Sequence, residues 1–298
     1  MSSQHSVSEI SVIPGYFHRL GLAARPQDGF ADWFERVLGT IRIDSGSRQV
    51  RGIPFTGGGN EEGVSEESGA SSEMIWLGNL PICIFAAVDD VGQLGSFVAK
   101  YGAGLHSVAW TVDDLWRTET LLRRNDIRIT GVDLPGRHFF MHPADTAGLL
   151  IELTDTEFIH DPRDNPEVLQ GAPVASVVQG ATFAWLSMAV ADPTKTAEVL
   201  AGIVESQVVE GLPRDPGQEA IDLQVNDVVI RIAKKAEGES GRDTLHSFCI
   251  AVPDLTDTCK RLESAGIAVT SQSQVLAWTN PTDTLGMKIQ WVQASALK

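Results

Sequence analysis

Short apolar runs alternate along the chain with segments of helical periodicity. Residues 17–39 (FHRLGLAARPQDGFADWFERVLG) predict a strand, a turn containing proline and glycine, and a helix that ends at Gly39. A second strand-then-helix segment is expected at 104–130, and single strands at 73–78, 81–88, 137–143 and 148–155. The first half therefore predicts the order βαβββ, twice.

The second half repeats the first. Residues 183–204 and 245–269 again predict a strand followed by a helix, and NPTDTLGMKIQWV (280–292) matches HPADTAGLLIELT (142–154) almost residue for residue. The polar, proline-containing stretch 157–180 is interpreted as a linker between the halves. A repeat of this length predicts an α+β protein of four βαβββ units paired into two domains, 12–156 and 180–295.

Composition narrows the class of protein. Residues 45–72 are rich in Gly, Ser and Glu and predict a long exposed loop. The net charge of −16 argues against nucleic acid or an anionic membrane as a partner. Three widely spaced cysteines without a CxxC motif, and a start without a secretory leader, indicate reduced thiols in a cytoplasmic protein. We expect a small-molecule ligand, and a homodimer is possible on this composition.

One short motif occurs twice. Residues 105–110 read LHSVAW and residues 245–250 read LHSFCI, and each run is followed by an aspartate and a leucine. The pattern indicates either a duplicated structural unit or a metal site whose ligands need rigid strands. Both interpretations stay open at this point.

The segments FVAKYGAGLHSVAWTVDDL and FMHPADTAGLLIELT resemble the vicinal oxygen chelate superfamily, which includes glyoxalase I, extradiol dioxygenases and bleomycin-resistance proteins. The resemblance covers nearly the whole chain as units. It is sharpest over residues 94–154, which are similar to methylmalonyl-CoA epimerases. It implies two glyoxalase-like domains, each a cupped mixed sheet with helices outside. It also implies one divalent ion per chain (Zn, Co, Mn or Fe(II)), bound by His18, His106 and Glu152.

The residues themselves support a catalytic metal site. Two imidazoles and a carboxylate leave open positions on an ion, as a catalytic site requires. Glu152 lies inside the apolar run LLIELT, where a carboxylate is costly unless it is paired or bound to a cation. In the second domain Trp185 is taken to stand at the position of His18, and Gln290 at that of Glu152; only His246 is kept. That domain is expected to be a scaffold or one wall of the substrate pocket.

Two further residues are candidates for additional roles. Glu73, in SSEMIWLG, resembles the catalytic glutamate of the epimerases and is a candidate base that removes a proton next to a metal-bound carbonyl, although it follows an acidic loop. Cys83 lies near the position where the epimerases supply a further ligand, and an inert buried thiol is the favoured interpretation. Glu152 is expected to serve both as a metal ligand and in catalysis.

The sequence therefore predicts a divalent-metal-dependent enzyme. It would chelate a dicarbonyl or 2-keto-type substrate and stabilise an enolate, as an epimerase, isomerase or lyase does. One alternative is an Fe(II) extradiol ring-cleavage dioxygenase, because two histidines and a carboxylate also form the non-haem iron triad. The other is a metal-free binding or resistance protein for a small molecule.

Overall fold

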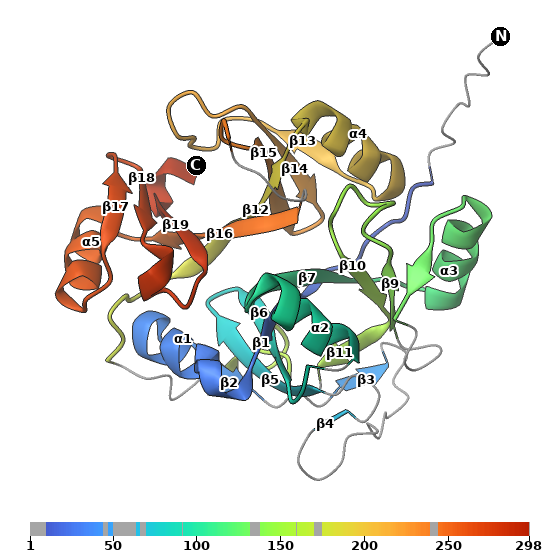
Figure 1. Ribbon diagram of the computed structural model, residues 1–298, viewed down its shortest axis with the longest axis horizontal. Coiled ribbons are helices and arrows are strands. Elements are labelled where there is room, and N and C mark those ends of the chain that lie inside the picture. The colour runs from blue at the N-terminus through green and yellow to red at the C-terminus, as the bar shows by residue number, and fades with distance from the viewer. Residues whose placement is uncertain are drawn as a thin grey trace.

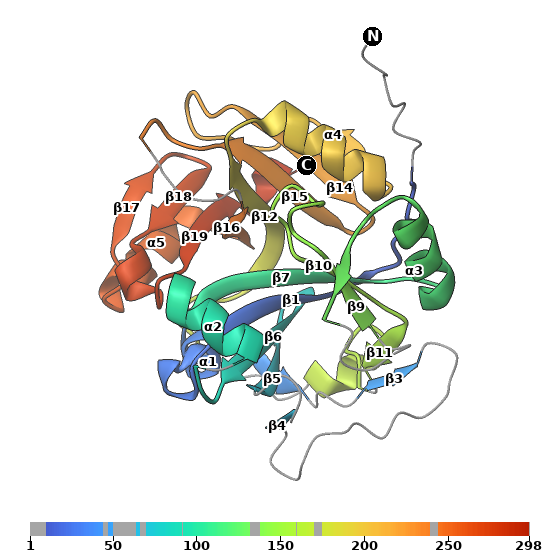
Figure 2. The ribbon, with the colours of Figure 1, turned by 45° about the vertical axis from the view of Figure 1, so that its right-hand side comes forward.

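The computed structural model describes residues 10–43, 47–49, 64–65, 70–90, 92–131, 138–158, 160–169, 175–238 and 244–297. Its main strands form two mixed sheets, one from each half of the chain (Figures 1 and 2). Most of the predicted loop 45–72 lies outside the described residues. No helix in the described ranges is long and apolar enough to cross a bilayer.

The first sheet has the strand order β2-β5-β6-β1-β7-β10-β9-β8, with β4 paired to β5. Its strands are β1 (Phe17–Ala24), β2 (Ile41–Ile43), β4 (Val64–Ser65), β5 (Ala70–Leu77), β6 (Leu80–Ala87), β7 (Gly104–Thr111), β8 (Ile129–Thr130), β9 (His138–Met141) and β10 (Ile151–Thr154). Its helices are α1 (Phe30–Leu38), α2 (Gly92–Tyr101) and α3 (Leu115–Arg124). The pairing of β1 with β6 is parallel, and that of β1 with β7 is antiparallel.

The second sheet repeats this topology in the order β13-β14-β15-β12-β16-β19-β18-β17. Its strands are β12 (Thr182–Val190), β13 (Gln207–Val209), β14 (Ala220–Val225), β15 (Val228–Lys234), β16 (Thr244–Val252), β17 (Val269–Gln272), β18 (Leu276–Thr279) and β19 (Lys288–Gln293), with helices α4 (Pro193–Ile203) and α5 (Leu255–Ser264). The predicted fold of paired βαβββ units is confirmed. The domain limits 12–156 and 180–295 stay a prediction.

The repeated aspartates explain where three helices begin. Asp114, Asp192 and Asp254 each lie directly before a helix, and the backbone of each aspartate is extended. Each side chain accepts a hydrogen bond from a backbone N–H in the first turn of its helix. This N-cap satisfies a donor that the helix itself leaves unpaired. α1 instead ends at Gly39, whose φ of 66° lies in the left-handed region, as predicted from its position.

Each large sheet has one apolar face turned to a shared core. In β1 the residues Leu20 and Leu22 are fully buried there, and α1 covers them with Phe34 and its apolar neighbours. The two halves meet in the same core, where the rings of Phe34 and Phe248 stack with their centroids 6.3 Å apart. The opposite face of each sheet is therefore left to form a cup.

The strand pairing contains two bulges that occur at equivalent places in both sheets. Between β1 and β7, Arg19 pairs with Ala109 and Gly21 with Ser107, and His18 and His106 are each an extra residue next to these pairs. Between β12 and β16 the extra residues are Ala184 and His246. A bulge places one additional residue in one strand and changes which side chains face each side of the sheet. The histidines of the repeated LHS motif are thus the same bulge residue in each half.

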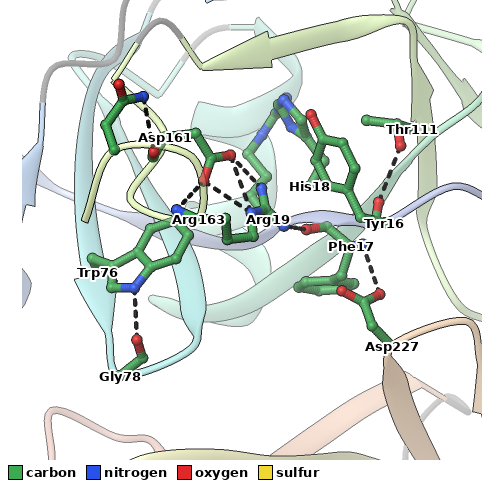
Figure 3. A network of polar contacts seen from close by, with 11 residues as sticks. Tyr16, Phe17, His18, Arg19, Trp76, Gly78, Thr111, Asp161, Arg163 and Asp227 are labelled. Carbon is green, nitrogen blue, oxygen red and sulfur yellow. Dashed lines mark hydrogen bonds and ion pairs between the residues drawn. The ribbon is translucent and has the colours of Figure 1, made fainter.

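The expected linker is in fact packed against the first sheet. Residues Thr156–Phe158 form strand β11, which pairs with β3 (Ser47–Gln49), and the 3₁₀ helix η2 (Pro166–Leu169) follows. Arg163 donates to both carboxylate oxygens of Asp161 and to the carbonyl oxygen of Phe17. Its guanidinium also lies over the rings of Tyr16 and Trp76, at 4.1 Å and 5.4 Å from their centroids (Figure 3). This segment therefore fixes the start of β1.

We expect Arg163→Ala to lower the free energy of unfolding by about 2–4 kcal/mol, because it leaves the buried Asp161 carboxylate without its cation. Arg128→Ala is a matched control, since its ion pair with Asp145 is exposed on the arginine side and such pairs contribute about 0–1 kcal/mol. Urea unfolding followed by circular dichroism measures both. Equal losses for the two variants would contradict a fixing role for Arg163.

Candidate functional site

The cup of the first sheet contains a cavity of about 160 Å³. Strands β1, β5, β6, β9 and β10 and the segment after β10 each contribute side chains, because alternate residues of a strand point to the same face. Its lining consists of His18, Arg19, Ser72, Met74, Cys83, Phe85, His138, Glu152, Thr154, Thr156 and Phe158. The cavity thus combines charged and polar groups with apolar side chains.

Arg19 is the central charged group of this cavity. Its guanidinium forms an ion pair with Glu152 and donates a hydrogen bond to Nδ1 of His18, at 2.6 Å. Glu152 is 1% exposed and the Arg19 side chain 14% exposed, so the pair is largely removed from water. Arg19 and Glu152 both lie in register with Ala109, one strand apart on either side of β7. The cation and the carboxylate therefore meet across a small residue.

Two polar atoms in the cavity are left without a partner. Arg19 can only donate, so Nδ1 of His18 must be the acceptor and the proton of the neutral ring must be on Nε2. Within the described part of the chain, neither this Nε2 nor Oε2 of Glu152 has a hydrogen-bond partner, although both are buried. The site presents one unused donor and one unused acceptor.

Burial controls the protonation of His18 and Cys83. Burial lowers the pKa of His18 well below its usual value, and the positive charges of Arg19 and Arg163 and the ring of His138 lower it further. The ring of His18 stacks on Phe158, with centroids 4.2 Å apart. Burial raises the pKa of the Cys83 thiol to about 12. At neutral pH His18 is therefore uncharged and Cys83 is an unreactive apolar wall, as predicted for that cysteine.

The predicted metal triad is not brought together. His18 and Glu152 line the cavity, but His106 does not: its ring packs edge-on against Phe97 of α2, at 4.7 Å between centroids. The physical reason is the bulge in β7, which leaves Ser107 and not His106 in register with Gly21. His106 is therefore not grouped with His18 and Glu152 in this cavity, and its assignment as a ligand stays a prediction.

The internal repeat gives a second correction. Trp185 pairs with Cys249 just as Arg19 pairs with Ala109, and in each sheet the residue before it is the unpaired bulge residue. Trp185 is therefore equivalent to Arg19, and Ala184 to His18. Gln290 pairs with Cys249 as Glu152 pairs with Ala109, which agrees with the predicted equivalence. An arginine therefore lies across the central strand from Glu152 in the first sheet, and a tryptophan lies across it from Gln290 in the second.

The remaining donors do not suit a divalent ion. Arg19 is a permanent cation, and it lies between the imidazole and the carboxylate that would have to bind the metal. No group of three or more His, Cys, Asp or Glu side chains is arranged to hold an ion within the described ranges. The expected ion, whether Zn, Co, Mn or Fe(II), thus has no matching ligand set here.

Glu73 lies on the other face of the sheet. Its neighbours in β5, Ser72 and Met74, line the cavity, so the side chain of Glu73 points away from it. That side chain is 44% exposed and forms an ion pair of 2.9 Å with Arg42. Glu73 therefore lies outside this cavity, and its role as the proton-removing base stays a prediction.

The cup of the second sheet is filled by its own side chains. Arg231 and Asp222, both fully buried, form two hydrogen bonds, and Arg214 also donates to Asp222. The guanidinium of Arg231 lies 4.3 Å from the centroid of the Trp185 ring. Both oxygens of this carboxylate have partners, unlike those of Glu152, so the first sheet is the better candidate for binding a ligand.

Sequence reasoning missed Arg19 and Phe158. Arg19 directly follows the predicted ligand His18, and an arginine inside an apolar strand is as unusual as the glutamate that was noticed. Phe158 was assigned to the linker, and its only signal is the apolar pair FI within a polar stretch.

Comparisons with known proteins define the class. No family model and no curated protein matches the sequence. Among solved structures, a mutant of 4-hydroxymandelate synthase from Streptomyces coelicolor is similar over 94% of this chain and 92% of that chain, with 10% identity and a TM-score of 0.61. The chain therefore shares its fold of paired βαβββ units with that structure.

Two other structures complete the comparison. A hypothetical protein from Staphylococcus aureus covers 93% of this chain and 98% of its own, with 10% identity and a TM-score of 0.56. Methylmalonyl-CoA epimerase from Mycobacterium tuberculosis, 21% identical, covers 48% of this chain and 88% of its own at a TM-score of 0.38, and that likeness carries no argument. These similarities establish the fold and not the activity.

The lowered pKa of His18 predicts a pH-dependent loss of stability. Below about pH 6.5 the unfolded chain takes up a proton that the folded chain does not, so stability falls as pH falls, by about 1.4 kcal/mol per unit. We expect the stability of wild type relative to His18→Gln to fall between pH 6.5 and 5. Denaturant unfolding at several pH values measures this, with His142→Gln, on a turn outside the cavity, as the control. A constant difference across this range would contradict the burial of a neutral His18.

Proposed function

We propose that the chain binds one small organic molecule in the cavity of the first sheet, and that this binding needs no divalent metal. The observation that carries the proposal is the position of Arg19, whose guanidinium pairs with Glu152 where an ion would otherwise have to bind. Of the functions that the sequence suggested, this corresponds to the metal-free binding protein.

The other two functions fit this cavity less well. A metal-dependent epimerase, isomerase or lyase and an Fe(II) dioxygenase both need an ion with at least two open positions. Here the first-strand position facing Glu152 carries an arginine, and His106 lies under α2. Two of the similar structures carry enzyme names, but their similarity concerns the fold. The expectation of an enzyme stays a prediction.

The size and lining of the cavity support a small ligand. A cavity of about 150 Å³ can hold benzene in another protein, so 160 Å³ suits a molecule of about one ring. Met74, Phe85 and Phe158 provide apolar walls, and Arg19 and Glu152 are the charged pair among the polar residues of the lining. Apolar side chains beside convergent polar groups are typical of small-molecule sites.

We expect fragments of one-ring size to bind the full chain in the presence of EDTA. Saturation-transfer NMR with a fragment mixture detects the binding. Ser72→Trp should abolish it, because Ser72 is exposed at the rim of the cavity and a tryptophan there would fill the opening. Glu73→Gln, on the opposite face, should bind like wild type.

The proposal fails if fragments bind only after Zn²⁺, Mn²⁺ or Fe²⁺ is added. It also fails if the purified chain retains one ion that Glu152→Gln loses. Elemental analysis of dialysed protein provides this second measurement.

A further inference from the structure

The two unpartnered atoms of the cavity indicate which hydrogen-bonding groups a ligand would carry. His18 Nε2–H is a donor and Glu152 Oε2 an acceptor, both in residues that are 1% exposed, and both residues line the same cavity. A buried polar group without a partner costs about 1–3 kcal/mol, and of the unpartnered side chains in the described residues only these two line this cavity. A ligand that pairs with both removes this cost.

Arg19 keeps these two atoms available. It occupies Nδ1 of His18 and Oε1 of Glu152, so only the opposite edge of each group is left for a ligand. Because one guanidinium joins both residues, the donor and the acceptor are fixed relative to each other. The buried carboxylate in the second cup has no such free atom, since two arginines occupy Asp222.

The charges of the cavity favour an uncharged ligand. Arg19 and Glu152 neutralise each other, and the nearby pair of Arg163 and Asp161 is likewise matched. An anion would have to compete with Glu152 for Arg19, and a cation would meet the guanidinium inside a largely dry site. Neither an anionic nor a cationic ligand therefore finds a net opposite charge in the cavity.

We infer that the ligand is an uncharged molecule of about one ring that offers a hydrogen-bond acceptor to His18 Nε2 and a donor to Glu152 Oε2, as a primary amide does. This inference rests on the proposed binding function. The apolar side of the ligand lies against Phe85 and Phe158, which line the same cavity.

Three probes of similar size test the ligand class on the full chain in EDTA. Benzamide has the acceptor and the donor, N,N-dimethylbenzamide has the acceptor alone, and benzoate carries a negative charge. We expect benzamide to bind at least about tenfold more tightly than the other two, because each of them leaves a buried group unpaired or adds an unmatched charge. NMR titration, with the His18 imidazole N–H as the reporter, gives the dissociation constants.

Two variants assign the contacts. His18→Phe keeps a ring that can stack on Phe158 but has no N–H, and it should weaken benzamide about tenfold. Glu152→Gln should reduce the preference for benzamide over N,N-dimethylbenzamide. Glu73→Gln should change neither value. If either cavity variant does not fold, the three probes on wild type still decide the question.

The outcomes separate this inference from the proposed function. Benzoate or N,N-dimethylbenzamide binding as tightly as benzamide in EDTA would overturn the ligand class and leave metal-free binding in the cavity intact. Absence of all three probes from the cavity would overturn the inference as well, while the fragment mixture and Ser72→Trp judge the proposed function independently. Binding of benzamide alone, weakened by His18→Phe, would support both.

Discussion

One buried ion pair, between Arg19 on β1 and Glu152 on β10, determines the character of the first cup. A carboxylate inside a sheet loses its hydration, and the loss is several kcal/mol unless a cation and further hydrogen bonds replace the water. Arg19 supplies that cation from a strand two positions away in the sheet, across Ala109. The same guanidinium holds the imidazole of His18. Which atoms are left for a ligand, and which charge a ligand can carry, both follow from this contact.

Much of the architecture could be predicted from the sequence because its signals are local. Helical periodicity, Gly39 and the capping aspartates mark the helices. The similarity of 142–154 to 280–292 predicts the equivalence of Glu152 and Gln290. The carboxylate of the site was also found from the sequence, since an acid in an apolar strand is rare. These features need no knowledge of how the strands pair.

The rest of the site depends on strand register. A shift of one residue moves a side chain to the other face of a sheet, and the shifts here come from bulges that no residue type in FHRLG or GLHSV announces. Because of these bulges Ser107, and not His106, stands in register with Gly21, and Arg19, and not His18, stands opposite Ala109. For Glu73 the reason is different. The sequence does not show where its strand begins after the acidic loop, so it does not show to which face of the sheet the side chain points.

The two cups show how one fold supports different interiors. In both, an arginine and a carboxylate are buried together, but from different strands: Arg19 with Glu152 in the first, Arg231 with Asp222 in the second. The second adds Arg214 and the Trp185 ring and closes its interior. Burying a matched pair is thus a shared solution, and only the completeness of the pairing differs.

The bulge at His18 has an evolutionary consequence. On either side of the bulge, Phe17 pairs with Trp110 and Leu20 pairs with Val108. The four residues 17–20 of β1 thus lie opposite the three residues 108–110 of β7. Loss of the single codon for Arg19 would leave both flanking pairs unchanged and place His18 opposite Ala109, facing Glu152. An arginine cup and a histidine cup are therefore one deletion apart. Lineages of this fold could pass between the two kinds of interior by gaining or losing a residue while the rest of the sheet stayed in place.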